Sequence, residues 1–212
     1  MQAYEDRMKL EEYERKRSVC FAESNMWKWT FENDDRENPR ISDAMQNYVK
    51  NFTEFRKEGK GLLLYGIVGT GKSYLAACVA NALIDMGYSA YMTNFTTILN
   101  ILSDKNTEKQ KYLNSLNRYD LLILDDLGVE RSTEYVLEHL FSIIDARYRS
   151  GLPFIITTNL TADELKKPQA VAYSRIYDRI LERCHPVKVE GVSRRRENLK
   201  SGFADVQRLL GL

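Results

Sequence analysis

The segment from Gly66 to Ser73 has the residue types and spacing most able to do chemistry in this 212-residue sequence. It runs Gly-Ile-Val-Gly-Thr-Gly-Lys-Ser and follows a short apolar stretch. Glycines let the backbone curl until its N–H groups point at phosphate oxygens, and a following helix adds the positive end of its dipole. The lysine can then reach the β- and γ-phosphates, and the serine hydroxyl can ligate Mg²⁺. The segment therefore predicts a site for a nucleoside triphosphate, most simply Mg-ATP.

A glycine-rich turn that binds no nucleotide is the alternative. We favour the nucleotide site because the segment lies between a predicted strand and a predicted helix, as phosphate binding by such a loop requires. The residues expected to hold the nucleotide are Gly66, Val68, Gly69, Thr70, Gly71, Lys72, Ser73 and Tyr74, and Ser73 is also an expected magnesium ligand.

Two carboxylates follow a second apolar run. Asp125 and Asp126 come directly after the four apolar residues 121–124. Ligands of open α/β sheets bind at the carboxyl ends of the strands, so these side chains should share an edge with the phosphate loop. We expect Asp125 to hold Mg²⁺ through water, and Asp126 to orient or deprotonate the attacking water. An Asp-rich turn into Gly128 without chemistry is the alternative.

A polar side chain also follows the next apolar run, at residues 154–157. Asn159 would lie where an amide could hold the lytic water beside the γ-phosphate, and we count it among the candidate catalytic residues. The alternative is that this stretch only leads into a helix cap near Thr161.

Arginines form the last candidate set. Arg175 and Arg179 are four residues apart, on one face of a helix predicted over 172–184, and three more follow at 194–196. A guanidinium brought to the γ-phosphate accelerates hydrolysis by roughly a thousandfold or more. Ion pairing with carboxylates such as Asp178 on a solvated surface is the alternative, and local sequence alone favours it.

Alternating strands and helices must position these residues. Continuous apolar strands separated by helices indicate an α/β fold with a parallel sheet covered on both faces. A polar helix or lead-in is expected over the first 20 residues or so. We expect strands at 62–65, 89–93, 121–124, 154–157 and 187–189. We expect helices at 41–58, 73–86, 95–102, 108–117, from a Ser132 cap to Gly151, and at 172–184.

Composition excludes several classes of protein. With 43% apolar and 29% charged residues the chain can bury a core and is not a disordered chain. No run of about 18 apolar residues exists to span a membrane. The three cysteines are widely separated and give no metal-binding or disulfide spacing, so a reducing, cytoplasmic location is the default. The net charge of +1 gives no indication of nucleic-acid binding.

Taken in order, these motifs resemble those of AAA+ ATPases of the bacterial helicase-loader group, the DnaC/DnaI type, and of the related IstB transposition helpers. The resemblance runs from about Trp27 to Leu199. It implies an AAA+ P-loop NTPase fold: a five-stranded parallel sheet of order 5-1-4-3-2 between helices, without a sizeable separate C-terminal lid domain. The expected divisions are a polar N-terminal lead-in at 1–26, the AAA+ domain at 27–200 and a tail at 201–212.

The resemblance also implies roles for single residues. Asn159 matches the first sensor of the family. Arg179 matches the arginine finger that reaches the ATP of a neighbouring subunit, with Arg175 in support. Arg195 matches the second sensor, which reads the nucleotide bound to its own subunit. Many relatives carry Asp-Glu where this chain has Asp125 followed by another aspartate, which indicates the slow turnover of a switch.

Single-stranded DNA in the loader group runs along an inserted helical segment after the second strand, and residues 95–119 match that segment. The resemblance implies that lysines there could touch phosphates and that Phe95 or Tyr112 could stack on bases. A solvated pair of amphipathic helices is the alternative. The candidate DNA contacts are Lys105, Lys109, Lys111 and Tyr112.

The resemblance implies an ATP-dependent loader of a replicative helicase, in which ATP binding at subunit interfaces drives self-association around single-stranded DNA and hydrolysis releases it. Relatives commonly bind the helicase through a separate N-terminal domain. Only about 25 residues precede the AAA+ region here, so we expect the helicase-binding region to be short or missing. An IstB-type transposase helper and a nucleotide-dependent scaffold without significant hydrolysis are the alternatives. A small-molecule kinase would leave Asn159, Arg179 and Arg195 unexplained.

Overall fold

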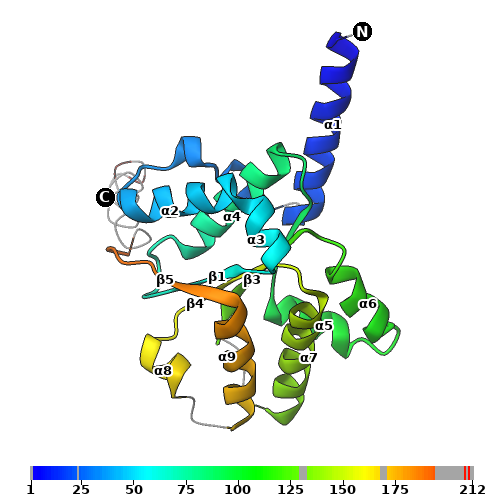
Figure 1. The fold of residues 1–212 in the computed structure, drawn as a ribbon, viewed down its shortest axis with the longest axis vertical. Coiled ribbons are helices and arrows are strands. Elements are labelled where there is room, and N and C mark those ends of the chain that lie inside the picture. Colours follow the sequence, from blue (N-terminus) through cyan, green and yellow to red (C-terminus); the bar gives the residue numbers. More distant parts are fainter. Residues whose placement is uncertain are drawn as a thin grey trace.

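A five-stranded parallel sheet forms the centre of the chain in the computed structural model, which describes residues 2–22, 24–128, 133–167, 171–193, 208 and 210 (Figure 1). The strand order is β2-β3-β4-β1-β5, with all four pairings parallel, which confirms the predicted 5-1-4-3-2 order. The central strands are apolar and buried on both faces, as expected when helices cover both sides. The strands are β1 (Gly61–Tyr65), β2 (Ala90–Asn94), β3 (Leu121–Leu127), β4 (Phe154–Thr158) and β5 (Cys184–Lys188).

Helices pack on both faces of this sheet and enclose one apolar cluster on each (Figure 1). Leu62 and Leu64 of β1 belong to one cluster and Leu63 to the other, as the two-residue period of a strand requires. One face carries α1 (Gln2–Phe21), α2 (Pro39–Lys50), α3 (Phe52–Glu58) and α4 (Lys72–Asp85). The other carries α5 (Phe95–Ser103), α6 (Lys109–Leu116), α7 (Glu134–Ser150), α8 (Ala162–Lys166) and α9 (Val171–Arg183).

The predicted polar N-terminal helix forms α1, whose first half extends away from the body of the molecule (Figure 1). Its last turn buries Cys20 and Phe21 against β2 and α4. The 3-10 turns Asn25–Lys28 and Phe31–Asn33 follow, and the Asn81 amide of α4 donates to the backbone carbonyls of Met26 and Trp29. The N-terminal segment is thereby fixed on the helix that follows the phosphate loop. Within the described ranges, none of the helices has the length and apolar character needed to cross a membrane.

Several element boundaries differ from the sequence expectations. The helix expected over 41–58 is broken at Asn51 into α2 and α3. The cap of α7 is Thr133, whose hydroxyl accepts the Val136 N–H, while the expected cap Ser132 lies outside the described residues. The last strand begins at Cys184 rather than 187. The residue after Cys184 precedes Pro186, and a residue before proline disfavours the helical conformation, so the chain leaves the helix there.

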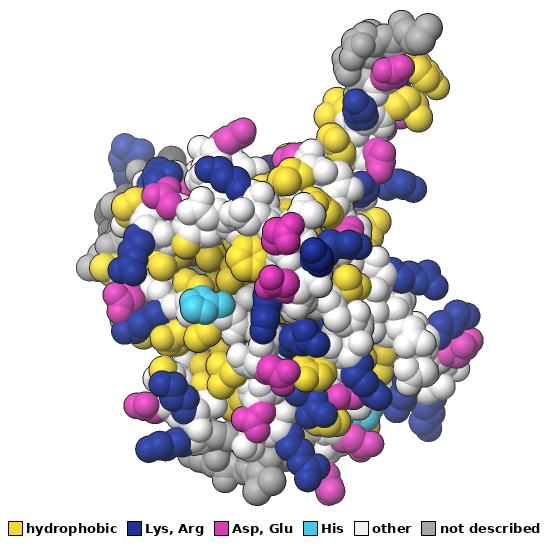
Figure 2. All heavy atoms as spheres, viewed as in Figure 1, with side chains coloured by type: hydrophobic (Ala, Val, Ile, Leu, Met, Phe, Trp, Pro, Cys, Tyr) yellow, Lys and Arg dark blue, Asp and Glu magenta, His cyan; other side chains and the backbone are white. Residues whose placement is uncertain are grey.

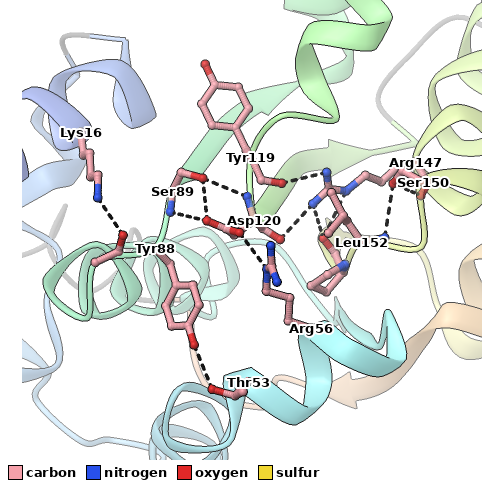
Figure 3. A network of polar contacts seen from close by, with 12 residues as sticks. Lys16, Thr53, Arg56, Tyr88, Ser89, Tyr119, Asp120, Arg147, Ser150 and Leu152 are labelled. Atoms are coloured by element: carbon pink, nitrogen blue, oxygen red, sulfur yellow. Dashed lines mark hydrogen bonds and ion pairs between the residues drawn. The ribbon is translucent and has the colours of Figure 1, made fainter.

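A buried arginine ties together the loops that enter the sheet (Figure 3). Arg147 of α7 is fully buried, and its guanidinium makes five hydrogen bonds to four backbone carbonyls that precede β3 and β4. Burial lowers the pKa of Arg147 to about 10. Beside it, the Asp120 carboxylate accepts from the Ser89 N–H at 2.8 Å and from the Arg56 guanidinium at 2.7 Å. The network fixes the amino ends of β2, β3 and β4, opposite the edge that carries the candidate site.

Candidate nucleotide-binding site

The glycine-rich segment forms the turn between β1 and α4, as predicted. Gly66 and Gly69 have φ angles of 146° and 88°, which L-residues with a side chain rarely adopt. A Cβ on Gly66 would lie 2.5 Å from the Val189 carbonyl oxygen, and one on Gly69 would overlap the Ser193 side chain. The loop therefore needs glycine for its conformation and for its close approach to the chain after β5. The Thr70 hydroxyl closes it by donating to the Ile67 carbonyl at 3.0 Å.

Lys72 is folded into this loop. It is the first residue of α4, its side chain is only 5% exposed, and its Nζ donates to the carbonyls of Gly66 at 2.9 Å and Ile67 at 2.7 Å. These are neutral acceptors, whereas hydrogen bonds between an ammonium and an anionic oxygen are roughly twice as strong. The geometry thus holds a buried cation at the mouth of the loop, beside the N-terminus of a 14-residue helix.

Asp125 lies across from this helix N-terminus, on β3. Its Oδ1 accepts the Thr157 hydroxyl at 2.6 Å, and the Ser73 hydroxyl lies near enough to the carboxylate to act on its pKa. Burial and the neighbouring Asp126 charge raise the pKa of Asp125, although both hydroxyls and Lys72 oppose the shift. A partly desolvated carboxylate beside a serine hydroxyl is a donor set that suits a hard cation such as Mg²⁺. The two expected magnesium ligands are therefore brought together.

Asp126 occupies an irregularity of the strand that the sequence did not indicate. Strand β3 does not end before the carboxylates but continues to Leu127, and its pairing with β4 shifts between Leu124 and Leu127. Asp126 has a φ angle of 57°, a left-handed conformation that aspartate adopts more readily than most residues. The side chain is exposed, and the backbone N–H donates to the Thr157 hydroxyl oxygen at 2.9 Å. Thr157 is a site residue that sequence reasoning missed.

Asn159 follows β4 and lines a cavity of about 530 Å³ together with Gly66 and Ile67 of the phosphate loop. Lys188 at the end of β5 and the three residues that follow it form another wall. Asn159 is half-exposed and thus reaches the edge of the sheet where the loop begins. The helix-cap alternative is also realised, because Thr161 and Glu164 form a capping box at the start of α8.

Tyr74, which follows the expected magnesium ligand Ser73, contacts the N-terminal segment. The Tyr74 hydroxyl donates to the Thr30 carbonyl at 3.0 Å, and its ring lies 5.8 Å from that of Trp29. This contact holds the N-terminal segment over the start of α4. Val68, by contrast, is exposed at the outside of the loop. The nucleotide contacts expected of both residues remain predictions.

Arg179 is engaged within its own chain. Its Nε donates to Asp145 Oδ1 at 2.9 Å, and its guanidinium lies 4.5 Å from the Phe141 ring centroid, both on α7. Arg179 is therefore ion-paired, as the alternative supposed, but its partner is Asp145 of α7 rather than Asp178. Arg175, one turn earlier, is exposed. The second expected sensor, Arg195, lies outside the described residues.

The expected DNA-contact segment forms α5, α6 and the turn between them. Lys105, Lys109 and Lys111 are exposed there. Figure 2 shows Lys and Arg side chains gathered, with some acidic ones, at the edge where α6 lies in Figure 1. Phe95 is fully buried, so the expectation that it stacks on a base is wrong. Tyr112 is half-buried and packs against the apolar cluster beneath α5 and α7.

An exposed ring in this region comes instead from α7. Tyr135 is 44% exposed. The centroid of its ring lies 4.1 Å from that of His139 and 5.9 Å from Lys109 Nζ. The Tyr135 carbonyl can only accept, so His139 Nδ1 carries the hydrogen of the 2.9 Å bond between them. Sequence reasoning missed the contact between Tyr135 and Lys109 because the two residues are on different helices.

Comparisons with known proteins agree with this geometry. The sequence model of the family described as "IstB-like ATP binding protein" matches residues 10–201. The replicative helicase loader DnaI of Bacillus subtilis is 30% identical over 207 residues, covering 88% of this chain and 66% of DnaI. The replicative helicase loader DnaC of Escherichia coli is 28% identical over 153 residues, covering 68% of this chain and 61% of DnaC. This chain thus spans about two thirds or less of the length of these relatives.

A crystal structure of DnaI superimposes with a TM-score of 0.68 at 26% identity, covering 85% of this chain and 99% of that one. The sheet order, the phosphate loop and the carboxylates at the end of β3 agree with the AAA+ P-loop NTPase fold that the motifs predicted. The chain belongs to the IstB-like ATP-binding protein family and, within it, resembles the DnaI and DnaC helicase loaders.

Proposed function

We propose that this chain is an AAA+ helicase loader that binds Mg-ATP and hydrolyses it slowly. The observation that carries the nucleotide chemistry is the meeting of Lys72, Ser73 and Asp125 at one edge of the sheet. A buried cation, a metal-binding hydroxyl and a partly buried carboxylate are the parts that phosphoryl transfer requires, and they come from two elements about 50 residues apart.

Each residue has a distinct task in this proposal. Lys72 exchanges two loop carbonyls for phosphate oxygens, and Ser73 and Asp125 would hold Mg²⁺. Held by these two side chains, Mg²⁺ would supply positive charge that offsets the negative charge of the phosphates during hydrolysis. Asp126 orients or deprotonates the attacking water, and the Asn159 amide holds that water from the side of β4. One short carboxylate in the role of base agrees with slow turnover.

The site is completed by a second subunit in this proposal. Arg179 reaches the γ-phosphate of a neighbour, and Arg195 reads the nucleotide of its own subunit. The pairing of Arg179 with Asp145 supports this role in one respect, because it fixes the guanidinium on the outer surface of α7 and α9 at 30% exposure. Nucleotide binding then drives self-association, and hydrolysis reverses it.

The partners follow from the names of the relatives, since DnaI and DnaC are both replicative helicase loaders. We therefore propose a replicative helicase and single-stranded DNA as partners. Lys105, Lys109 and Lys111 would contact phosphates, and Tyr135 rather than Tyr112 would stack on a base.

Particle size tests the loader proposal. The purified protein is measured by light scattering with ADP, with a slowly hydrolysed ATP analogue, and with that analogue plus a single-stranded oligonucleotide. We expect growth beyond a monomer only with the analogue, and most with the oligonucleotide. The same size in all three conditions would contradict nucleotide-driven assembly on DNA.

A transposase helper of the IstB type is the second candidate, because the family whose model matches this chain is described as IstB-like. The two functions differ in the DNA that they bind. Competition between single-stranded and duplex oligonucleotides of the same sequence separates them. Preference for the single strand supports the loader, and preference for the duplex supports the transposase helper.

A further inference from the structure

Thr157 stands opposite the irregularity in strand β3 that carries the two aspartates. Regular pairing joins Leu124 to Ile156, and the next joined pair is Leu127 with Thr158. Three steps along β3 therefore match two steps along β4, which is the extra residue of a β-bulge. Thr157 is the β4 residue between those pairs, and it is fully buried.

The hydroxyl of Thr157 bonds to both aspartates, and the direction of each bond is fixed. The backbone N–H of Asp126 can only donate, so the Thr157 oxygen accepts it at 2.9 Å. The single hydroxyl hydrogen is then given to Asp125 Oδ1 at 2.6 Å. A donor directed at Oδ1 favours the ionised carboxylate and fixes the plane in which its other lone pairs lie.

We propose that Thr157 is a positioning residue that sets both aspartates for magnesium binding and hydrolysis. One bond orients the metal-binding carboxylate of Asp125. The other holds Asp126 in the left-handed conformation that leaves its side chain exposed at the edge of the sheet. This role rests on the proposed Mg-ATP site and adds a third residue, outside both aspartates and the phosphate loop, that controls the affinity for the metal.

The neighbouring threonine provides a matched control. Thr158 is equally buried, but both partners of its hydroxyl are backbone groups. The hydroxyl donates to the Leu127 carbonyl at 2.7 Å and accepts the Leu160 N–H at 3.1 Å. Replacing either threonine by valine keeps the shape and removes one buried hydroxyl. Both variants should lose stability, whereas only Thr157→Val removes a bond to a carboxylate.

The test measures how Mg²⁺ tightens the binding of a slowly hydrolysed, fluorescent ATP analogue, followed by steady-state hydrolysis. Wild type, Thr157→Val, Thr157→Ser and Thr158→Val are titrated with Mg²⁺ at a temperature where circular dichroism shows each to be folded. Groups that orient metal-binding side chains alter affinity or activity by about 10- to 100-fold. We expect a shift of that size in the half-saturating Mg²⁺ concentration and in kcat for Thr157→Val. Thr157→Ser should recover most of the loss, and Thr158→Val should stay within about threefold of wild type.

Each outcome separates the inference from the proposed function. An unchanged Mg²⁺ response in Thr157→Val, or equal shifts in both valine variants, overturns the positioning role alone. Wild-type protein that binds no nucleotide at any Mg²⁺ concentration overturns the proposed function and the positioning role with it.

Discussion

Replacement of Arg147 by methionine should destabilise the whole domain. Methionine keeps part of the apolar stem but removes the guanidinium, which donates five hydrogen bonds to four backbone carbonyls, and the bonds to Tyr119 and Asp120 can be followed in Figure 3. Each buried acceptor left without a donor costs about 1 to 3 kcal/mol, so the loss is roughly 4 to 12 kcal/mol at most. The burial of the charge offsets part of it, because a pKa lowered from 12.5 to about 10 corresponds to roughly 3 kcal/mol.

The net expectation is a loss of about 3 to 5 kcal/mol, the usual effect of breaking a buried charged network. For a domain of this size that lowers Tm by roughly 6 to 20 °C. Urea unfolding followed by circular dichroism measures the free energy directly. Arg149→Met is the control, since that side chain is 75% exposed and its ion pair with Asp145 is worth about 1 kcal/mol or less. An Arg147→Met protein within about 1 kcal/mol of wild type would refute the reasoning.

Three further changes test other parts of the molecule. The pKa of Asp120 is lowered, because the Ser89 hydrogen bonds and the Arg56 ion pair outweigh the effect of burial. Its contribution to stability is therefore present above the unfolded pKa near 4 and is lost as pH falls below it. Asp120→Asn should flatten the decline of the unfolding free energy on acidification, and an unchanged decline would contradict this. Tyr135→Ala should weaken single-stranded DNA binding by about 5- to 150-fold in fluorescence anisotropy, with Tyr135→Phe close to wild type, because stacking on one base is worth about 1 to 3 kcal/mol. Equal affinity in the alanine variant would remove the ring from the DNA site. Arg179→Ala should leave nucleotide affinity within about threefold and cut hydrolysis by roughly a thousandfold in the assembled protein, so full activity would exclude the finger role.

The sequence was sufficient for the sheet and the phosphate loop because their signals are local. Runs of apolar residues predicted β1, β3 and β4, and weaker patterns predicted β2 and, with a start three residues too late, β5. The loop motif predicted the turn between β1 and α4. The order of the strands came with the family resemblance, and the pairing registers confirm it.

The rest of the site depends on contacts between residues distant in the chain. The bond between Thr157 and Asp125 spans 32 residues, and that between Arg179 and Asp145 spans 34. Neither threonine nor aspartate indicates such a partner through its local pattern. Arg147 was missed for the same reason, because a charged residue on a helix suggests a solvated face. Only the packed structure shows that this side chain is buried, with its guanidinium bonded to four backbone carbonyls.

Nucleotide affinity of the Lys72→Ala variant tests the central proposal most directly. Equilibrium titration with a fluorescent ATP analogue and Mg²⁺ is compared for wild type, Lys72→Ala and Lys111→Ala, an exposed lysine far along the chain on α6. Hydrogen bonds to charged groups are worth about 1.5 to 3 kcal/mol each, and Lys72 can make two, so we expect a loss of about 100-fold or more for Lys72→Ala. Lys111→Ala should match wild type. Equal affinity for wild type and Lys72→Ala would contradict the assignment of the Gly66–Ser73 loop as the phosphate site.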